Sequence, residues 1–494
     1  MASTGEAPIT LRMAERICAF SRRDLTPRAL RQARTAIADT IGVTLAGLPE
    51  ACTQILLRTP GVAAAPGDAL IFGTARRTTA LDAALVNGTA SHALDYDDFS
   101  SDMGGHQSVP LVAPLFALAE ERGASGERLV LAYVIGIEAM IRLARAVNFV
   151  HYDKGWHPTA TLGVFGAAAA CSHLLGLDAR RTATALALAA SMASGLKANF
   201  GTMTKPFHVG HCGRNGLLAA LMAEQGFEAR HGVMEHKQGF LDVFNGPGLH
   251  DALRIFAGWG DPWEIEAPGI ALKQFPCCGS THPAIAMMLQ LAKEEGIAAK
   301  DVARIEILPH SRRLPHTDNP WPRTPLEAKF SVQYAVVRAL LSGTPRLAHF
   351  EGEAPLEPEV QRLLALTSAA PHPGMPADGP NQWGAEVTVT LQDGRRLSRR
   401  VDQLVGRGGD NPMSSEELWE KFRDCAERGG LPRENVAPLF DRLESIEEAT
   451  NIRDVTRLLE RPGAPGAEAG ARGGRPLFAE VERSDVPLET SWVP

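Results

Sequence analysis

Apolar residues recur with the period of an α-helix along most of the first half of the chain. Residues 29–48 show this spacing after Thr26-Pro27, a capping residue followed by proline at the first helical position. Residues 129–147 are apolar on nearly every side, which predicts a helix in the middle of a bundle. Asp178 predicts the start of a third helix over residues 179–196. We therefore expect a helical domain over residues 1–269.

The hydrophobic period changes near residue 270. Residues 303–308 alternate as in a β-strand, and residues 327–341 have the pattern of an amphipathic helix. Residues 387–401 alternate on either side of Asp393-Gly394, which predicts a hairpin. These elements predict a smaller α+β domain over residues 270–404.

Helical spacing returns after the α+β segment. Ser414 and Glu417 form a capping-box pattern, and helical spacing continues to about residue 459. We expect residues 405–460 to rejoin the helical domain and residues 461–494, rich in Gly, Ala and Pro, to form a flexible C-terminal tail. The predicted fold class is mainly α with an inserted α+β domain: a helical bundle domain plus a smaller lid domain.

Composition narrows the functional classes. The chain has 494 residues, of which 45% are hydrophobic and 22% charged, as is typical of a soluble enzyme. A formal net charge of -7 argues against a nucleic-acid surface, which needs a face rich in Lys and Arg. Seven cysteines without metal-type spacing indicate a reducing compartment, and the N-terminus lacks the pattern of a secretory signal. No apolar run reaches membrane-spanning length, so we expect a cytoplasmic protein that binds neither nucleic acid nor membrane.

Ionisable residues gather in four segments rich in glycine or proline. Segment 201–216 carries Lys205, His208, His211 and Arg214 in what we interpret as a Gly-rich turn that opens a helix, a setting that favours an anionic ligand. The other three segments contribute these candidates: Asp95, Asp97, Asp98 and His106; His157; and Lys273, Cys278 and His282. A single such histidine or cysteine is more often structural than catalytic, whereas four segments of this kind in loops indicate a functional site.

Metal and cofactor sites are alternatives to a site made of side chains alone. Cys278 and His282 could share a helix face, but no Cys-x-x-Cys or His-Glu-x-x-His pattern supplies the other zinc ligands. Asp97, Asp98 and Asp102 are similar to the aspartate-rich magnesium motif of isoprenoid synthases, yet the sequence shows no second acidic motif. No Gly-x-Gly-x-x-Gly follows a strand and no Walker-type loop occurs, so we expect no metal and no cofactor.

Lysines, histidines and one carboxylate are sufficient for proton transfer next to a substrate carboxylate. A general base can remove a proton from the adjacent carbon when nearby cations hold the charge that develops. Histidine transfers protons near neutral pH, and lysine binds carboxylates as a point charge. Elimination of water, decarboxylation and epimerisation of a di- or tricarboxylic acid share this requirement, so the residues alone leave the reaction open.

Five motifs, in order along the chain, resemble the MmgE/PrpD family. They are residues 87–98 (Asn-Gly-Thr-Ala-Ser-His-Ala-Leu-Asp-Tyr-Asp-Asp), 155–158 (Gly-Trp-His-Pro), 201–208 (Gly-Thr-Met-Thr-Lys-Pro-Phe-His), 273–283 (Lys-Gln-Phe-Pro-Cys-Cys-Gly-Ser-Thr-His-Pro) and 327–334 (Glu-Ala-Lys-Phe-Ser-Val-Gln-Tyr). The resemblance implies a helical domain with an inserted α+β lid domain, a homodimer and a cofactor-free active site between the domains. It also implies that the pocket is lined by Asp95, His106, His157, Lys205 and Lys273, with His208 and His282 as additions.

We therefore predict a cofactor-independent lyase that acts on a small di- or tricarboxylic acid. Dehydration of the 2-methylcitrate type is the main prediction. Decarboxylation of the cis-aconitate type is an alternative, which is weakened because animal-type decarboxylases carry a histidine and a threonine near the positions of Cys278 and Phe99. Epimerisation of the iminodisuccinate type is another alternative, and a non-catalytic carboxylate-binding protein is an alternative of a different class. The predicted catalytic residues are His106, His157, Lys205 and Asp95, and the predicted substrate-binding residues are Lys273, His208, His282 and Cys278.

Overall fold

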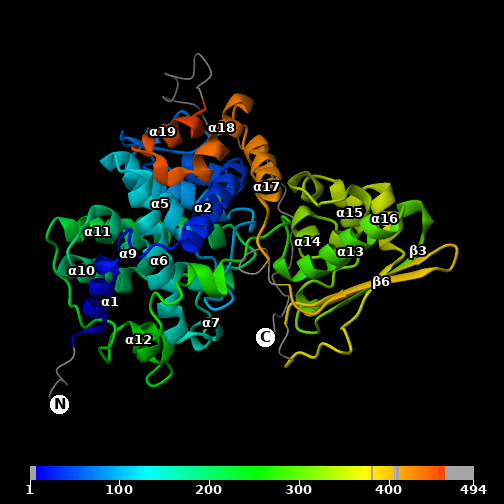
Figure 1. Ribbon diagram of the computed structural model, residues 1–494, viewed down its shortest axis with the longest axis horizontal. Coiled ribbons are helices and arrows are strands. Elements are labelled where there is room, and N and C mark those ends of the chain that lie inside the picture. The colour runs from blue at the N-terminus through cyan, green and yellow to red at the C-terminus, as the bar shows by residue number, and fades with distance from the viewer. Residues whose placement is uncertain (1–6, 380–381, 405–406, 408–410, 462–494) are drawn as a thin grey trace. The chain divides into compact units, whose positions relative to one another are not determined.

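The computed structural model describes residues 7–379, 382–404, 407 and 411–461, which are mainly helical (Figure 1). Up to residue 270 the α-helices are α1 (Ile9–Ala19), α2 (Pro27–Gly47), α3 (Ala51–Arg58), α4 (Ala80–His92), α5 (Val109–Arg122), α6 (Gly126–Val147), α7 (Val150–Asp153), α8 (Pro158–Thr161), α9 (Gly163–Leu175), α10 (Ala179–Met192), α11 (Thr204–Glu224) and α12 (Phe240–Asn245). The short strands β1 (Ala69–Leu70) and β2 (Arg77–Thr78) pair with each other. The prediction of a mainly α fold with some β-structure is confirmed.

Side-chain caps account for the helix starts that the sequence predicts. Thr26, Ser125 and Asp178 each accept a hydrogen bond from the backbone N–H three residues further on, at the starts of α2, α6 and α10. The predicted end of the third helix is wrong. α10 stops at Met192 rather than at residue 196, because the backbone becomes extended at the next residue and Gly195 adopts φ 130°.

Segment 201–216 differs from the predicted Gly-rich turn. α11 begins at Thr204, so Lys205 lies in its first turn and the later glycines lie inside the helix. A Cβ on Gly210 would overlap the backbone of α4, and a Cβ on Gly213 would lie 3.0 Å from a carbonyl oxygen of α5. These glycines therefore allow close helix packing, which brings Lys205 near the loop that follows α4.

A four-stranded sheet with helices against it follows residue 270, at the right of Figure 1. Its strands are β3 (Val302–Pro309), β4 (Thr367–Ala369), β5 (Ala385–Leu391) and β6 (Arg396–Val401), in the order β4-β3-β5-β6. β3 pairs with β4 in parallel, and the other pairs are antiparallel. The predicted strand and hairpin are confirmed, and Gly394 takes φ 89° in the hairpin turn.

The helices of this segment are α13 (His282–Glu295), α14 (Pro325–Lys329), α15 (Val332–Ser342) and α16 (Pro358–Leu364). The single helix predicted over residues 327–341 is wrong, because α14 and α15 are separate. Phe330 leaves helical geometry at φ -112° and ψ 22°, and Ser331 then caps α15 by accepting a hydrogen bond from the backbone N–H of Tyr334.

The chain then returns to helices with α17 (Ser415–Arg428), α18 (Arg433–Glu444) and α19 (Arg453–Thr456). Ser414 and Glu417 form the predicted capping box, and α17 and α18 pack on α2. The tail predicted over residues 461–494 lies outside the described residues, apart from Arg461.

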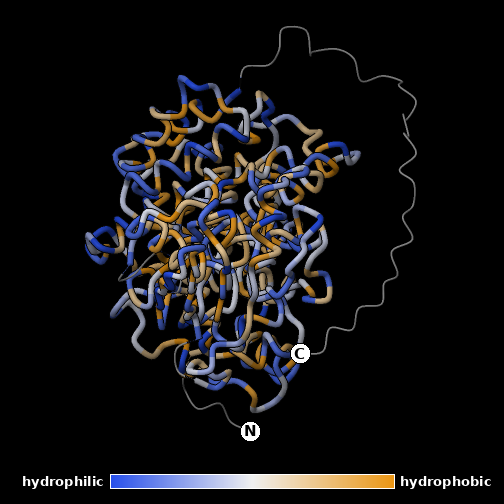
Figure 2. Tube along the Cα trace, turned by 90° about the vertical axis from the view of Figure 1, so that its right-hand side faces the viewer, coloured by the Kyte–Doolittle hydropathy of each residue, from blue (hydrophilic) through white to orange (hydrophobic). Residues whose placement is uncertain are grey.

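Two large groups of buried apolar side chains form most of the interior of the described chain, beside two small ones. One large group joins the helices before residue 270 to α17–α19, and the other lies between the sheet and helices α13, α15 and α16. Hydrophobic segments run mostly through the inside of the trace (Figure 2). The described part of the chain up to Arg461 forms one compact unit that contains both cores. The division into two domains and its boundaries stay a prediction.

One apolar helical stretch, Pro158–Leu175, has the length and hydropathy of a membrane-crossing segment. It is 89% buried inside the structure, and the core helix of a soluble protein passes the same test. The stretch is therefore weak evidence for a membrane protein.

Candidate active site

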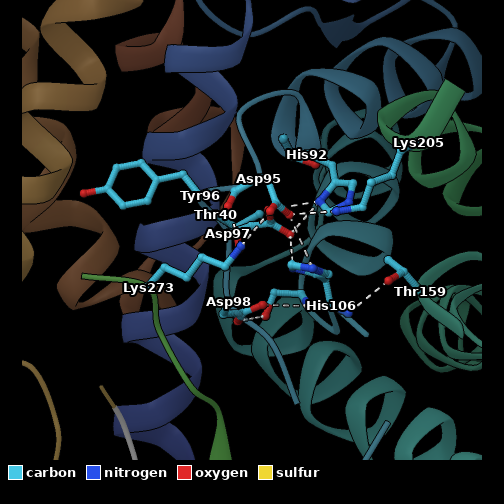
Figure 3. Close-up of polar contacts among 12 residues, drawn as sticks. Thr40, His92, Asp95, Tyr96, Asp97, Asp98, His106, Thr159, Lys205 and Lys273 are labelled. Carbon is cyan, nitrogen blue, oxygen red and sulfur yellow. Dashed lines mark hydrogen bonds and ion pairs between the residues drawn. The ribbon is translucent and has the colours of Figure 1, made fainter. Parts of the chain in front are cut away.

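Asp95 lies at the centre of a cluster of ionisable side chains, in the loop after α4 (Figure 3). Its backbone is left-handed, with φ 52°, which aspartate adopts more readily than most residues. Lys205 Nζ lies 2.8 Å from Asp95 Oδ1, and Lys273 Nζ lies 3.2 Å from Oδ2. Two ammonium groups from distant parts of the sequence thus meet one carboxylate.

The Asp95 carboxylate is ionised and reaches solvent. Its side chain is 32% exposed, against 19% for Lys205 and 6% for Lys273. Burial by itself would raise the pKa of Asp95, but Lys205, Lys273 and His106 outweigh it and hold this pKa well below its ordinary value. Asp95 is therefore a weak base near neutral pH.

The Asp97 carboxylate contacts two histidine rings. His92 Nδ1 lies 2.9 Å from Asp97 Oδ2, and His106 Nδ1 lies 2.9 Å from the same oxygen. On the other side of the His106 ring, Nε2 lies 3.6 Å from Asp95 Oδ1. The backbone N–H of His106 donates to Thr159 Oγ1 at 3.0 Å. The ring is thus placed between two carboxylates, with Nε2 directed to the side where the lysines converge (Figure 3).

His92 and Asp97 form a pair of a neutral ring and an anion. Burial lowers the pKa of His92 to about 4, although Asp97 acts in the opposite direction. Burial would raise the pKa of Asp97, but His106 and His92 outweigh it and keep this pKa well below its ordinary value. His92 was not among the predicted site residues. Its position within motif 87–98, in the last turn of α4, is the only sequence signal that could have indicated it.

His157 and His208 form a second histidine pair. His157 precedes α8, His208 lies on α11, and their Nδ1 atoms are 3.2 Å apart. Burial lowers the pKa of His157 well below its ordinary value, so its ring is neutral near pH 7. It packs edge-on against Phe200, with ring centroids 4.9 Å apart. His211 stacks on Phe207 instead, at 5.6 Å.

Cys278 and His282 lie near Lys273 but differ in their surroundings. Cys278 is partly exposed and within electrostatic range of Lys273 and Asp95, and burial raises the pKa of its thiol. His282 is buried at the start of α13, with Nε2 3.3 Å from the Cys277 carbonyl oxygen. Burial lowers the pKa of His282 to about 3. Both substrate-binding roles stay predictions, and the contacts of His282 are those of a structural residue.

The three aspartates of the magnesium-type pattern do not converge. Asp98 accepts a hydrogen bond from the backbone N–H of Ser108 at 3.3 Å, whereas Asp102 pairs with Arg145 at 2.9 Å. Asp97 faces the two histidines described above. The isoprenoid-synthase alternative therefore does not fit this arrangement.

One group of side chains has the spacing of metal ligands. The ligand atoms of His92, Asp95, Asp97 and His106 all lie within 4.8 Å of one another. The ammonium groups of the two lysines at Asp95 would repel a cation there, and both imidazoles are directed to Asp97. These residues therefore fit an anionic ligand beside the lysines better than a metal ion.

A buried ion pair supports the cluster from α17. Lys421 Nζ lies 2.5 Å from Asp39 Oδ1 of α2. The same ammonium donates to the backbone carbonyls of Tyr96, at 3.0 Å, and Lys273, at 2.8 Å. No motif in the sequence indicates this role, because Lys421 lies within the ordinary amphipathic pattern of α17.

Two family models match the chain. The MmgE/PrpD N-terminal domain matches residues 11–250, and the MmgE/PrpD C-terminal domain matches residues 275–438. The chain belongs to the MmgE/PrpD family. The family predicted from the five motifs is therefore confirmed.

This MmgE/PrpD chain is also similar to proteins named cis-aconitate decarboxylase. The human protein is 30% identical over 457 residues, which cover 89% of this chain and 92% of the relative. The mouse protein is 28% identical over 453 residues, with 89% and 90% covered, and the Aspergillus terreus protein is 27% identical over 462 residues, with 89% and 93% covered. Decarboxylases are lyases, so the predicted enzyme class is confirmed.

Proposed function

We propose that this MmgE/PrpD protein is a cofactor-independent decarboxylase of the cis-aconitate type. The observation that carries the proposal is the similarity, over 89% of the chain, to proteins of that name from human, mouse and Aspergillus terreus. These relatives favour decarboxylation over dehydration, which was the main prediction from the sequence.

The reaction requires stabilisation of an anion and delivery of one proton. cis-Aconitate carries three carboxylates around one C=C bond. When the bond between its CH2 carbon and the attached carboxylate breaks, CO2 leaves and the electron pair forms a new C=C bond. The electron pair of the old C=C bond moves to the carbon beside another carboxylate, where a proton adds. The product is a dicarboxylic acid with a terminal methylene group.

Lys205 and Lys273 are suited to stabilise the anion. Their ammonium groups lie 2.8 and 3.2 Å from Asp95 in a partly buried setting, where Coulomb attraction is stronger than in bulk water. We assign both lysines to the substrate carboxylates and to the negative charge that spreads over them during bond cleavage.

His106 is suited to deliver the proton. The Asp97 carboxylate contacts Nδ1 of His106, so Nε2 is left to exchange the proton. The same carboxylate stabilises the ring when the ring is charged. Asp95 is a poor proton carrier, because Lys205 and Lys273 outweigh the effect of burial and keep its pKa low. We assign Asp95 to the orientation of His106 and of the lysines. His157, paired with His208, is the second candidate for proton transfer.

Incubation of the purified full chain with cis-aconitate tests the proposal. We expect one CO2 for each substrate consumed and terminal C=CH2 signals in the proton NMR spectrum. Lys205→Ala should lower kcat/KM about 100- to 1,000-fold, the range for loss of one group that stabilises transition-state charge, with a nearly unchanged Tm. Lys237→Ala removes an exposed lysine and is the matched control, so its kcat/KM should equal that of the wild type.

Four outcomes would contradict the proposal. Loss of water from 2-methylcitrate without turnover of cis-aconitate would indicate the dehydratase. Inversion of iminodisuccinate would indicate the epimerase. Binding of every acid without turnover would indicate a carboxylate-binding protein. Loss of activity in EDTA, restored by a divalent cation, would contradict the metal-free site.

A further inference from the structure

Arg313 is a cation outside the Asp95 cluster, in the turn that follows β3. Its Nε donates to the Gln382 carbonyl at 2.9 Å, and its Cζ lies 3.7 Å from the centroid of the Trp383 ring. Within the part of the chain that the structure describes, its guanidinium pairs with no carboxylate, and its terminal nitrogens have no acceptor. The cation–π contact fixes the side chain while leaving two donor groups for a ligand.

An aromatic stack connects this guanidinium to the loop of Asp95. Trp383 packs against Phe99, with ring centroids 5.6 Å apart. Phe99 exchanges two backbone hydrogen bonds with Ala271, at 2.9 and 3.0 Å. Ala271 lies two residues before Lys273, so the stack is attached to the segment that carries this lysine.

Gly279 packs against the aromatic stack, and Cys278, its neighbour in the chain, lies near Lys273. A Cβ on Gly279 would lie 3.7 and 3.8 Å from the rings of the stack, so this glycine packs directly against them. The thiol of Cys278 is within electrostatic range of both Lys273 and Arg313.

The two lysines of the Asp95 cluster already face two carboxylates. Lys205 and Lys273 oppose the carboxylates of Asp95 and Asp97, while the ring of His92 is neutral. A tricarboxylate adds three negative charges to this partly buried site, where uncompensated charge is costly. An unpaired guanidinium offsets one of them and can donate two parallel hydrogen bonds to a carboxylate.

We propose that Arg313, held on Trp383, binds a third substrate carboxylate, beyond the two that Lys205 and Lys273 hold, and thereby selects tricarboxylates over dicarboxylates. The inference rests on the proposed function, which places the reacting carbon of the substrate at Asp95. The binding of a carboxylate at Arg313 can be tested without any reaction.

Binding of two unreactive acids tests this subsite. Tricarballylate has three carboxylates and no C=C bond, and glutarate has the same carbon chain without the central carboxylate. Isothermal titration should show that Arg313→Ala weakens tricarballylate binding roughly 10- to 100-fold, and glutarate binding by less than about threefold. Arg313→Lys should fall between wild type and Arg313→Ala, because lysine keeps the charge but not the paired donors. In turnover, Arg313→Ala should raise KM for cis-aconitate more than it lowers kcat.

Arg312→Ala is the matched control, since it removes the same charge from an exposed neighbour and should leave both affinities unchanged. Equal weakening of both acids by Arg313→Ala, or an equal effect of Arg312→Ala, would overturn the subsite. If Arg313→Ala does not fold, as judged by its Tm, Arg313→Lys provides the same comparison. Arg313-dependent binding without decarboxylation would refute the proposed function alone. Decarboxylation of cis-aconitate with the same KM in the wild type and in Arg313→Ala would refute the subsite alone.

Discussion

At the scale of single residues, Asp97 and Asp98 are adjacent carboxyl groups whose pKa values are shifted in opposite directions. Burial favours the neutral form of both. At Asp97, His106 and His92 outweigh burial and hold the pKa well below its ordinary value, whereas at Asp98 burial prevails over the Ser108 hydrogen bonds and raises the pKa well above it. Asp97 thus orients imidazole rings as an anion, whereas the surroundings of Asp98 favour its neutral form.

We expect Asp97→Asn and Asp98→Asn to change stability with opposite pH dependence. A carboxyl group with a lowered pKa in the folded state contributes stability above its pKa in the unfolded chain, about 4. This stability is lost as pH falls through the folded-state pKa. Asp97→Asn should therefore cost on the order of 2 kcal/mol near neutral pH and less in acid. A carboxyl group with a raised pKa in the folded state contributes stability in acid, and this contribution is lost as pH rises. The stability of Asp98→Asn should therefore increase relative to that of the wild type as pH rises. Thermal unfolding from about pH 2 to 8 covers both pH ranges, and equal slopes would contradict the assignment.

At the scale of elements, α17 holds the site through Lys421. Its ammonium forms an ion pair with the buried Asp39 and donates hydrogen bonds to the carbonyls of Tyr96 and Lys273. Tyr96 follows Asp95 in the chain, and Lys273 contacts it. Removal of one partner of a buried ion pair leaves an uncompensated charge, whereas replacement of both partners by apolar groups often restores stability.

We expect Lys421→Met to lower the free energy of unfolding by about 3–5 kcal/mol and also to lower kcat, because the two carbonyls lose their donor. The double variant Asp39→Leu/Lys421→Met should regain most of the stability but not kcat. Urea unfolding and steady-state kinetics separate the two effects. Recovery of kcat together with stability would mean that Lys421 is structural and does not position the site.

At the scale of the whole molecule, local signals were predictable and contacts between distant segments were not. The caps at Thr26 and Ser125 and the turn at Gly394 depend on neighbouring residues, so the pattern indicated them. The close packing of Gly210 and the role of Lys421 depend on segments far away in the sequence. The motifs identified the Asp95 cluster, and its supporting residues became visible only in three dimensions. The homodimer and the cytoplasmic location stay predictions.

The cluster joins the two cores, and this has a measurable consequence for unfolding. Lys205 lies on a helix of the first core, whereas Lys273 leads into the segment that builds the second. A tricarboxylate that binds both lysines only in the folded state should stabilise the whole described unit, by about 2.7 kcal/mol at 100 times Kd. Calorimetry with tricarballylate should therefore show a Tm that rises with the logarithm of ligand concentration, and the double variant Lys205→Ala/Lys273→Ala should abolish the rise. An equal rise in the double variant would place the ligand elsewhere.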